Sequence, residues 1–302
     1  MDAHRDLTLE LGEAYGHHAG GSLEWADGDE AQRELRTRVA RLASRGYRAE
    51  LIARDEALAL EPGLGIAPAV SQVAFYADEA WLDAPRAARA LVDAAQRDGA
   101  EIRRTTVRSL RRDGGRITGL QTSDGELSAT ATLVCVGPST QGFLEPLGVT
   151  MPVGRVHGLL AVTSPVSERL DRVVHAPGVH LRPDSEGGLL LGADDLDGPA
   201  VTEASPARRA GIATEMLQRA ARVFSAAQKA EIRTIRVGVR PMPSDRHTIA
   251  GPIPGLGHAW MIATHSGITL GPLLGRLLSE EIVQATPSTL LAPFRPSRFA
   301  ST

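Results

Sequence analysis

The stretch that decides the fold is GVRPMPSDRHTIAGPIPGLGHAWMIATHSGITLGPLLGRLLSEEI, residues 238–282. Within it, the apolar run HAWMIAT predicts a strand that breaks at Thr264–Gly267, and the residues after the break have an apolar face at helical spacing. The first backbone N–H groups of a helix have no partner inside the helix. The pattern therefore predicts a helix entrance that can hold an electron-rich ligand. A plain glycine-rich turn between a strand and a helix is the alternative.

Length and composition describe an ordinary globular chain. It has 302 residues, of which 42% are hydrophobic and 23% charged, and its formal net charge is −3. This length allows one or two domains with a sizeable core. The sequence contains no apolar run of about 18 residues, and its start lacks the basic-then-apolar pattern of a secretory signal. We therefore expect no membrane span.

The charge pattern bears on nucleic-acid binding, and the cysteine content bears on the redox state of the compartment. Arginines are interleaved with acidic residues, so no basic stripe for a nucleic acid stands out. Cys135 is the only cysteine and cannot form an internal disulfide, which fits a reducing, cytoplasmic compartment. Its setting, LVCVG, predicts a buried strand and an inert thiol.

Helix signals come first along the chain. Residues 30–46 place three apolar side chains on one helical face, and Asp55 is expected to cap a second, short helix. Asp83 is expected to cap a third helix, which ends before Gly99. This part of the sequence therefore predicts three helices.

Strand signals follow. EIRRTTV (101–107), RITGLQT (116–122) and the run ending in LVCVG (133–137) are strand candidates. From residue 152 to 241, several further strand patterns surround one helix at 206–221, which predicts an antiparallel sheet. The whole pattern is typical of a layered fold with mixed α and β structure.

The blocks of residues 238–282 resemble, in their order, the C-terminal signature of the glycine oxidase, sarcosine oxidase and D-amino-acid oxidase superfamily of FAD enzymes. The blocks are Arg240-Pro241, Asp245, Ile249 with Gly251-Pro252, His265-Ser266-Gly267 and a helix start at Gly271-Pro272. Three earlier segments resemble other parts of that family: GSLEWADGDEAQRELRTRVARLASRGY with a following LEP, LDAPRAARALVDAAQRDGAEIRRTTVRSL, and LRPDSEGGLLLGADD. The resemblance covers nearly the whole chain.

The resemblance implies an α/β fold of mixed α+β character with two domains. An incomplete FAD-binding Rossmann-like domain is expected at residues 1–20, 84–150 and 242–302. An antiparallel-sheet substrate domain is expected at residues 21–83 and 151–241.

One block of the family is not found. Its members open with a strand, G-x-G-x-x-G and a helix, where the backbone approaches the pyrophosphate of FAD. Gly63-Leu-Gly65 and Gly255-Leu-Gly257 lack the third glycine and the helix. We therefore expect Met1 to fall beyond this unit, either in a fragment or mis-started reading frame, or in a descendant that has lost half of its cofactor site. FAD is expected for a complete version, and exposed sheet edges are expected to favour self-association.

The resemblance also implies the site residues. The turn and helix start would lie against the pyrimidine edge of the flavin ring, Val107 would hold the adenine through its main chain, and Gly137 would lie where its strand approaches the cofactor. Arg240 would bind a substrate carboxylate, and a structural salt bridge with Asp245 is the alternative. We assign no catalytic residue. The expected residues of the turn are Thr264, His265, Ser266, Gly267, Ile268 and Thr269.

Other chemistry is weakly supported. His17-His18 lacks further ligands at zinc spacing, and the acidic residues at 194–197 fit a solvated turn better than a calcium site. The sequence therefore predicts a flavin-dependent oxidoreductase that acts on a small amine or amino acid. The alternative is a non-catalytic, cofactor-free remnant or binding module of the same fold.

Overall fold

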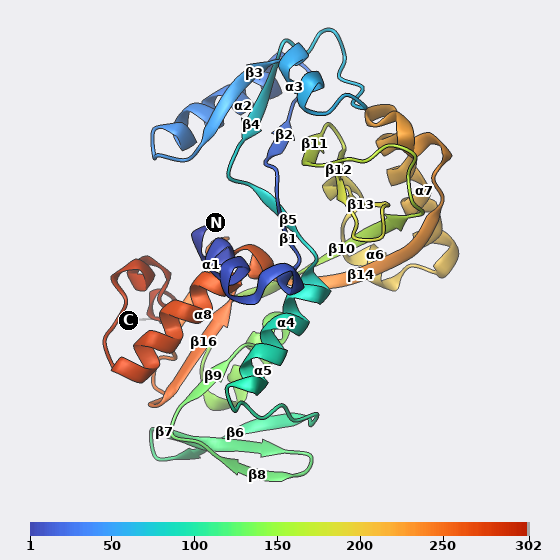
Figure 1. Ribbon diagram of the computed structural model, residues 1–302. Coiled ribbons are helices and arrows are strands. Elements are labelled where there is room, and N and C mark those ends of the chain that lie inside the picture. The colour runs from blue at the N-terminus through green and yellow to red at the C-terminus, as the bar shows by residue number, and fades with distance from the viewer. Residues whose placement is uncertain (301–302) are drawn as a thin grey trace. The chain divides into compact units, whose positions relative to one another are not determined.

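The computed structural model describes residues 1–300, apart from the side chains of residues 199 and 200. The chain folds into two compact units, and each unit is built from two separate stretches. The first unit contains Met1–Val92 and His157–Gly238, and the second contains Asp93–Val156 and the chain from Val239 onward. The chain therefore crosses between the units three times. Figure 1 colours the chain by residue number, from blue at the N-terminus to red at the C-terminus. The assignment of a cofactor domain and a substrate domain stays a prediction.

An eight-stranded mixed sheet forms the centre of the first unit, in the order β14-β10-β13-β12-β11-β2-β4-β3. Strands β11 and β2 run parallel, whereas the pairs of β13 with β10 and of β4 with β3 are antiparallel. A separate antiparallel pair joins β1 to β5. The strands are β1 His17–Ala19, β2 Ser22–Glu24, β3 Ala49–Ala53, β4 Gln72–Tyr76, β5 Ala80–Leu82, β10 Val153–Thr163, β11 Val173–Ala176, β12 Val179–Pro183, β13 Leu189–Gly192 and β14 Ile232–Pro243.

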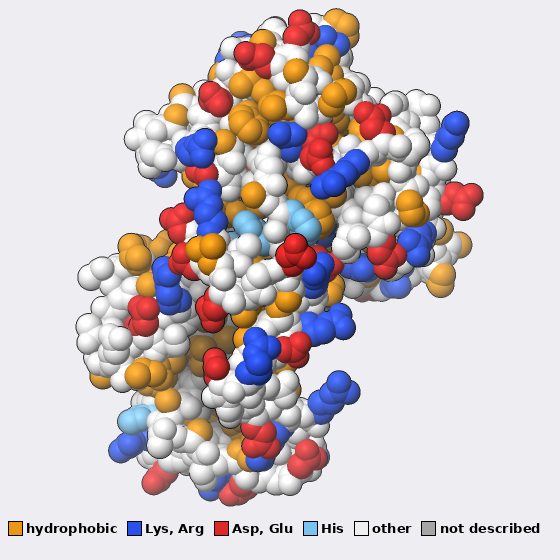
Figure 2. Space-filling model, in the orientation of Figure 1, with side chains coloured by type: hydrophobic (Ala, Val, Ile, Leu, Met, Phe, Trp, Pro, Cys, Tyr) orange, Lys and Arg blue, Asp and Glu red, His pale blue; other side chains and the backbone are white. Residues whose placement is uncertain are grey.

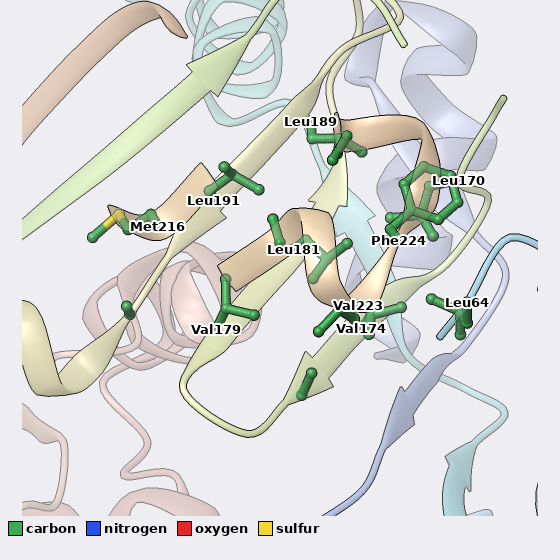
Figure 3. Packing of buried hydrophobic residues seen from close by; sticks show 14 of the residues in the cluster. Leu64, Leu170, Val174, Val179, Leu181, Leu189, Leu191, Met216, Val223 and Phe224 are labelled. Carbon is green, nitrogen blue, oxygen red and sulfur yellow. The ribbon is translucent and has the colours of Figure 1, made fainter. Parts of the chain in front are cut away.

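Helix α7 covers part of this sheet and supplies much of the core. It buries Met216, Ala220 and Val223 at helical spacing, and the Ser205 side chain caps it by accepting the N–H of Arg208. Figure 3 shows Met216 and Val223 among the leucines and valines of β11, β12 and β13. The helices of this part of the chain are α1 Asp2–Leu11, α2 Asp29–Ala43, α3 Arg54–Leu60, α4 Ala84–Arg97, α6 Pro199–Glu203 and α7 Pro206–Val223.

The predicted helices of the first unit are confirmed, except for the start of α3. Leu35 and Val39 of α2 are buried, and the Asp83 carboxylate caps α4 by accepting the N–H of Arg86 at 3.2 Å. The predicted N-cap at Asp55 is wrong, because the cap position of α3 is Ala53. The Glu56 carboxylate accepts the Ala53 N–H at 2.8 Å, and this bond fixes the helix start two residues earlier.

The second unit contains two three-stranded sheets, β15-β16-β9 and β6-β7-β8. Strand β16 runs antiparallel to β15 and parallel to β9, and its Met261 is fully buried with Ile249 of β15. The elements are β6 Val107–Asp113, β7 Arg116–Thr122, β8 Gly125–Ser128, β9 Thr132–Val134, α5 Thr140–Leu144, β15 Ile249–Pro252, β16 Ala259–Ala263 and α8 Gly267–Gln284.

Two predictions about this unit are wrong. The strand predicted at 101–107 only begins at Val107, because the β6–β7 hairpin closes with Asp113 opposite Arg116 and the pairing ends with Val107 opposite Thr122. Cys135 is exposed, not buried. Strand β9 lies at the edge of its sheet and ends one residue before this cysteine, so no neighbouring strand covers that edge.

The mixed α/β fold class is confirmed, with antiparallel pairs in most of the sheet of the first unit. Figure 2 shows basic and acidic side chains intermixed over the visible face. Within residues 1–300, no helix combines the length and apolar character that crossing a bilayer requires.

Candidate functional site

The turn between β16 and α8 is held by hydrogen bonds of one buried side chain, that of Thr264. Thr264 is 9% exposed, and its hydroxyl shares a 2.9 Å hydrogen bond with the hydroxyl of Thr248. The same oxygen accepts the N–H of Ser266 at 3.3 Å. Residues 265–269 are exposed. One buried side chain thus holds a turn whose remaining residues face outward.

The first backbone N–H groups of α8 receive no hydrogen bond from the side chain of the N-cap residue. Ser266 is the N-cap residue, but its side chain makes no capping hydrogen bond, and the first intrahelical bond runs from the Leu270 N–H to the Ser266 carbonyl. The N–H groups of Gly267 and Ile268 therefore have no acceptor inside the helix, and they lie at the positive end of its dipole. This arrangement favours an electron-rich ligand.

The space beside Gly267 is open. A methyl group built on Gly267 would meet nothing within 4 Å, and the neighbouring Ile268 side chain is 56% exposed. A flat ligand can therefore approach the backbone closely at this position.

The predicted helix start at Gly271-Pro272 is wrong, because α8 begins at Gly267 and contains Pro272 in its second turn. Proline has no N–H, so the Ile268 carbonyl, four residues earlier, receives no intrahelical hydrogen bond. The free amides at the helix entrance, those of Gly267 and Ile268, thus lie five and four residues before Pro272.

The structure brings Gly137 to the same edge of the sheet as this turn. Strands β9 and β16 are parallel, with Leu133 opposite Trp260, so the segments that follow them leave from the same edge. Gly137 has φ +54°, a left-handed conformation that favours glycine. A methyl group built on it would meet Cγ of Pro241 at 4.0 Å, so Gly137 also lies beside Pro241. Ligands of α/β sheets commonly bind beyond the carboxyl ends of parallel strands.

Arg240 is half-buried near the end of β14. The Asp245 carboxylate, its alternative partner, is bound by the Arg298 guanidinium through contacts of 2.7 and 3.2 Å. The hydrogen bonds from Arg298 hold the pKa of Asp245 below its usual value. No local pattern predicts this pair, because Arg298 lies 53 residues later in the chain, in a 3₁₀ helix. The role of Arg240 stays a prediction.

Val107 lies in the other sheet of this unit. It is the first residue of β6, is 37% exposed and pairs with Thr122. An isolated parallel bridge between Arg116 of β7 and Gly257 joins its sheet to the segment that leads into β16. Its contact with an adenine stays a prediction.

The residues present fit the ring end of FAD. The open space at Gly267, the uncapped amides and the left-handed Gly137 offer a close approach to backbone along one sheet edge. Residues 1–302 contain no G-x-G-x-x-G segment, so these residues offer no contact of that type to the pyrophosphate.

Comparison with known proteins supports the expected family. The sequence model of the family described as FAD dependent oxidoreductase (DAO) matches residues 1–281. A glycine oxidase of Pseudomonas aeruginosa is 30% identical over 251 residues, which cover 80% of this chain and 66% of that protein. A D-amino acid dehydrogenase of Methylobacterium nodulans is 30% identical over 294 residues, which cover 90% of this chain and 68% of that protein. The chain thus spans about two thirds of the length of these curated relatives.

A solved structure agrees with the sequence matches. Glycine oxidase from Geobacillus kaustophilus superposes with a TM-score of 0.86 at 26% identity, covering 98% of this chain and 81% of that one.

Proposed function

Because this chain belongs to the FAD-dependent oxidoreductase family, as its sequence predicts, we propose that it carries the flavin-ring and substrate contacts of an enzyme that oxidises an amine or amino acid. Relatives named glycine oxidase and D-amino acid dehydrogenase support this substrate class. The observation that carries the proposal is the open helix entrance at Gly267, at the sheet edge where Gly137 also lies.

FAD, when bound beside Gly267 and Gly137, would supply the hydride acceptor: the substrate would lose a hydride from the carbon beside nitrogen and a proton from the nitrogen, and water would hydrolyse the resulting imine. The amides of Gly267 and Ile268 stabilise negative charge on the ring, and Thr264 keeps their turn in place. Arg240 binds the substrate carboxylate, for which a planar guanidinium offers two parallel N–H donors. Protein groups thus position the substrate and polarise the ring.

The proposal is tested by titrating the purified chain with FAD and recording the visible spectrum. We expect a perturbed flavin spectrum on binding, and loss of the oxidised-flavin absorbance when glycine, sarcosine or a D-amino acid is added without oxygen. A folded chain that leaves the FAD spectrum unchanged would favour the non-catalytic alternative.

Gly267→Val should weaken FAD binding about tenfold or more, because a branched side chain fills the space proposed for the ring edge. The substituted side chain meets no protein atom near its Cβ, so the fold should be retained. Fluorescence quenching of FAD measures the affinity. Gly211→Val, at another helical glycine with open surroundings, is the matched control and should bind FAD as the parent does. Equal affinity of all three proteins would remove Gly267 from the site.

Arg240→Ala should raise the apparent KM for an amino acid about ten- to a hundredfold, because it removes hydrogen bonds to a charged carboxylate. The KM of Arg240→Lys should lie between those of the parent and of Arg240→Ala, since lysine keeps the charge but not the paired donors. Steady-state kinetics with an amine that has no carboxylate provides the control. If KM rises equally for both substrates, Arg240 acts on the structure of the site and not on the carboxylate.

A further inference from the structure

A cavity of about 510 Å³ lies within the first unit. The start of α4, strand β10, the turn between β12 and β13, and strand β14 all contribute to its walls. Its volume is in the range of small-molecule sites. Five of its lining residues are arginines: Arg86, Arg89, Arg182, Arg233 and Arg236. None of the residues predicted to contact flavin or substrate lines this cavity.

The three acidic residues that line the same cavity are engaged by other groups. Asp83 accepts the backbone N–H of Arg86, and Asp184 accepts the backbone N–H of Glu186 at 3.1 Å. The Glu186 carboxylate pairs with Arg233 at 2.9 Å. The carboxylates therefore neutralise one of the five guanidinium groups directly.

The other four arginines have no carboxylate within ion-pair distance in the described part of the chain. Arg86 and Arg89 lie three positions apart on α4, so they share one face of the helix. Arg182 and Arg236 come from strands β12 and β14. Guanidinium donors thus reach the cavity from a helix and from the sheet.

Arg182 is held in place by contacts other than a direct ion pair. Its guanidinium lies over the Trp81 ring, 5.4 Å from the centroid, and it donates to the Pro183 carbonyl at 2.7 Å. Burial lowers the pKa of Arg182, and the nearby Arg236 lowers it further, against the opposing effect of Asp184 and Asp83. Clustered, partly desolvated cations are costly unless an anion joins them.

We propose that this cavity binds a small oxyanion with at least two negative charges, such as a phosphate group or a dicarboxylate. Arginine suits both, because its fork of N–H groups matches carboxylate and phosphate oxygens in pairs. A doubly charged ligand offsets the uncompensated arginines, and its oxygens accept from the helix side and the sheet side together. A single carboxylate offers too few acceptors for both sides.

Calorimetric titration of the full 302-residue chain at low ionic strength tests the proposal, with inorganic phosphate, succinate and acetate as probes. We expect phosphate or succinate to bind at least about tenfold more tightly than acetate. Tighter binding of phosphate identifies a phosphate group as the ligand, and tighter binding of succinate identifies a dicarboxylate. Equal, weak binding of all three overturns the proposal.

Variants locate the binding within the cavity. Arg236→Gln changes an exposed side chain and should reduce the affinity about tenfold while leaving the urea midpoint unchanged. Arg182→Gln should reduce it at least as much. Arg45→Gln is the matched control, since Arg45 is an exposed arginine of the same unit outside the cavity. If Arg236→Gln and Arg45→Gln lower the affinity equally, the anion binds by net charge alone and the proposal fails.

Discussion

Glu281→Ala should destabilise the second unit by about 3–5 kcal/mol, the range for a buried ion pair that loses one partner. The Glu281 side chain is 7% exposed, and its two carboxylate oxygens receive two hydrogen bonds from Arg295, at 3.0 and 2.7 Å. The N–H of Ser288 donates to it at 3.0 Å. Alanine leaves the Arg295 guanidinium buried without its carboxylate. Urea unfolding, followed by circular dichroism, measures the loss.

The same pair predicts how stability depends on pH. Burial by itself raises the pKa of Glu281, but hydrogen bonds from Arg295 and Ser288 outweigh it, so the net pKa lies below the usual value near 4.5. Ionised Glu281 therefore stabilises the fold above that pH, and the contribution is lost as the pH falls through the lowered pKa. The difference between parent and Glu281→Ala should be constant near neutrality and shrink in acid.

Glu280→Ala is the control on the same helix, because Glu280 is exposed and its removal should change stability by less than about 0.5 kcal/mol. A Glu281→Ala protein that unfolds at the same urea concentration as Glu280→Ala would show that the ion pair contributes nothing measurable.

Phe224→Ala should destabilise the first unit by about 3–5 kcal/mol, the usual cost of emptying a buried phenylalanine site. Phe224 is fully buried at the end of α7, where Figure 3 shows it within the apolar cluster. A methyl group built on Gly63 would meet its ring at 2.5 Å, so the ring lies directly on the Gly63 backbone. The Ser225 N–H also donates to the Gly63 carbonyl, which ties this loop to the end of α7.

Urea unfolding measures this effect too, with Phe224→Leu expected to lose about 1.5 kcal/mol or less because it keeps most of the volume. Leu9→Ala is the control, since Leu9 is 86% exposed in the same unit. Equal midpoints for Phe224→Ala and Leu9→Ala would mean that the cluster closes over the lost ring without penalty.

Local patterns in the sequence predict the helices and the candidate turn well. Spacing of Leu35 and Val39 sets the buried face of α2, and Asp83 marks the start of α4, because both signals act within a few residues. The strand that breaks at Thr264 and the helix after it are likewise visible in the sequence. The residue pattern alone does not say which ligand the turn binds. The resemblance to the flavin-dependent family predicts that the ligand is FAD.

Features that depend on distant segments escape sequence reasoning. Glu281 stands in the run SEEI, which is typical of a solvated helix end. In the fold it is buried in an ion pair with Arg295, which lies 14 residues later. Cys135 stands in an apolar run, yet it is exposed just after the end of β9, an edge strand. The arginine-lined cavity draws on four segments, and no local spacing in the sequence marks it.

The three crossings between the units have a consequence for synthesis on the ribosome. The first unit needs residues up to Gly238 and the second needs residues beyond Val239, so neither can close while the first half of the chain emerges. The early strand β2 pairs with β4 but must wait for β11 as its other neighbour, which leaves an edge of the early β2-β4-β3 strands unpaired. We therefore expect nascent chains of this protein to expose apolar segments until translation is nearly finished.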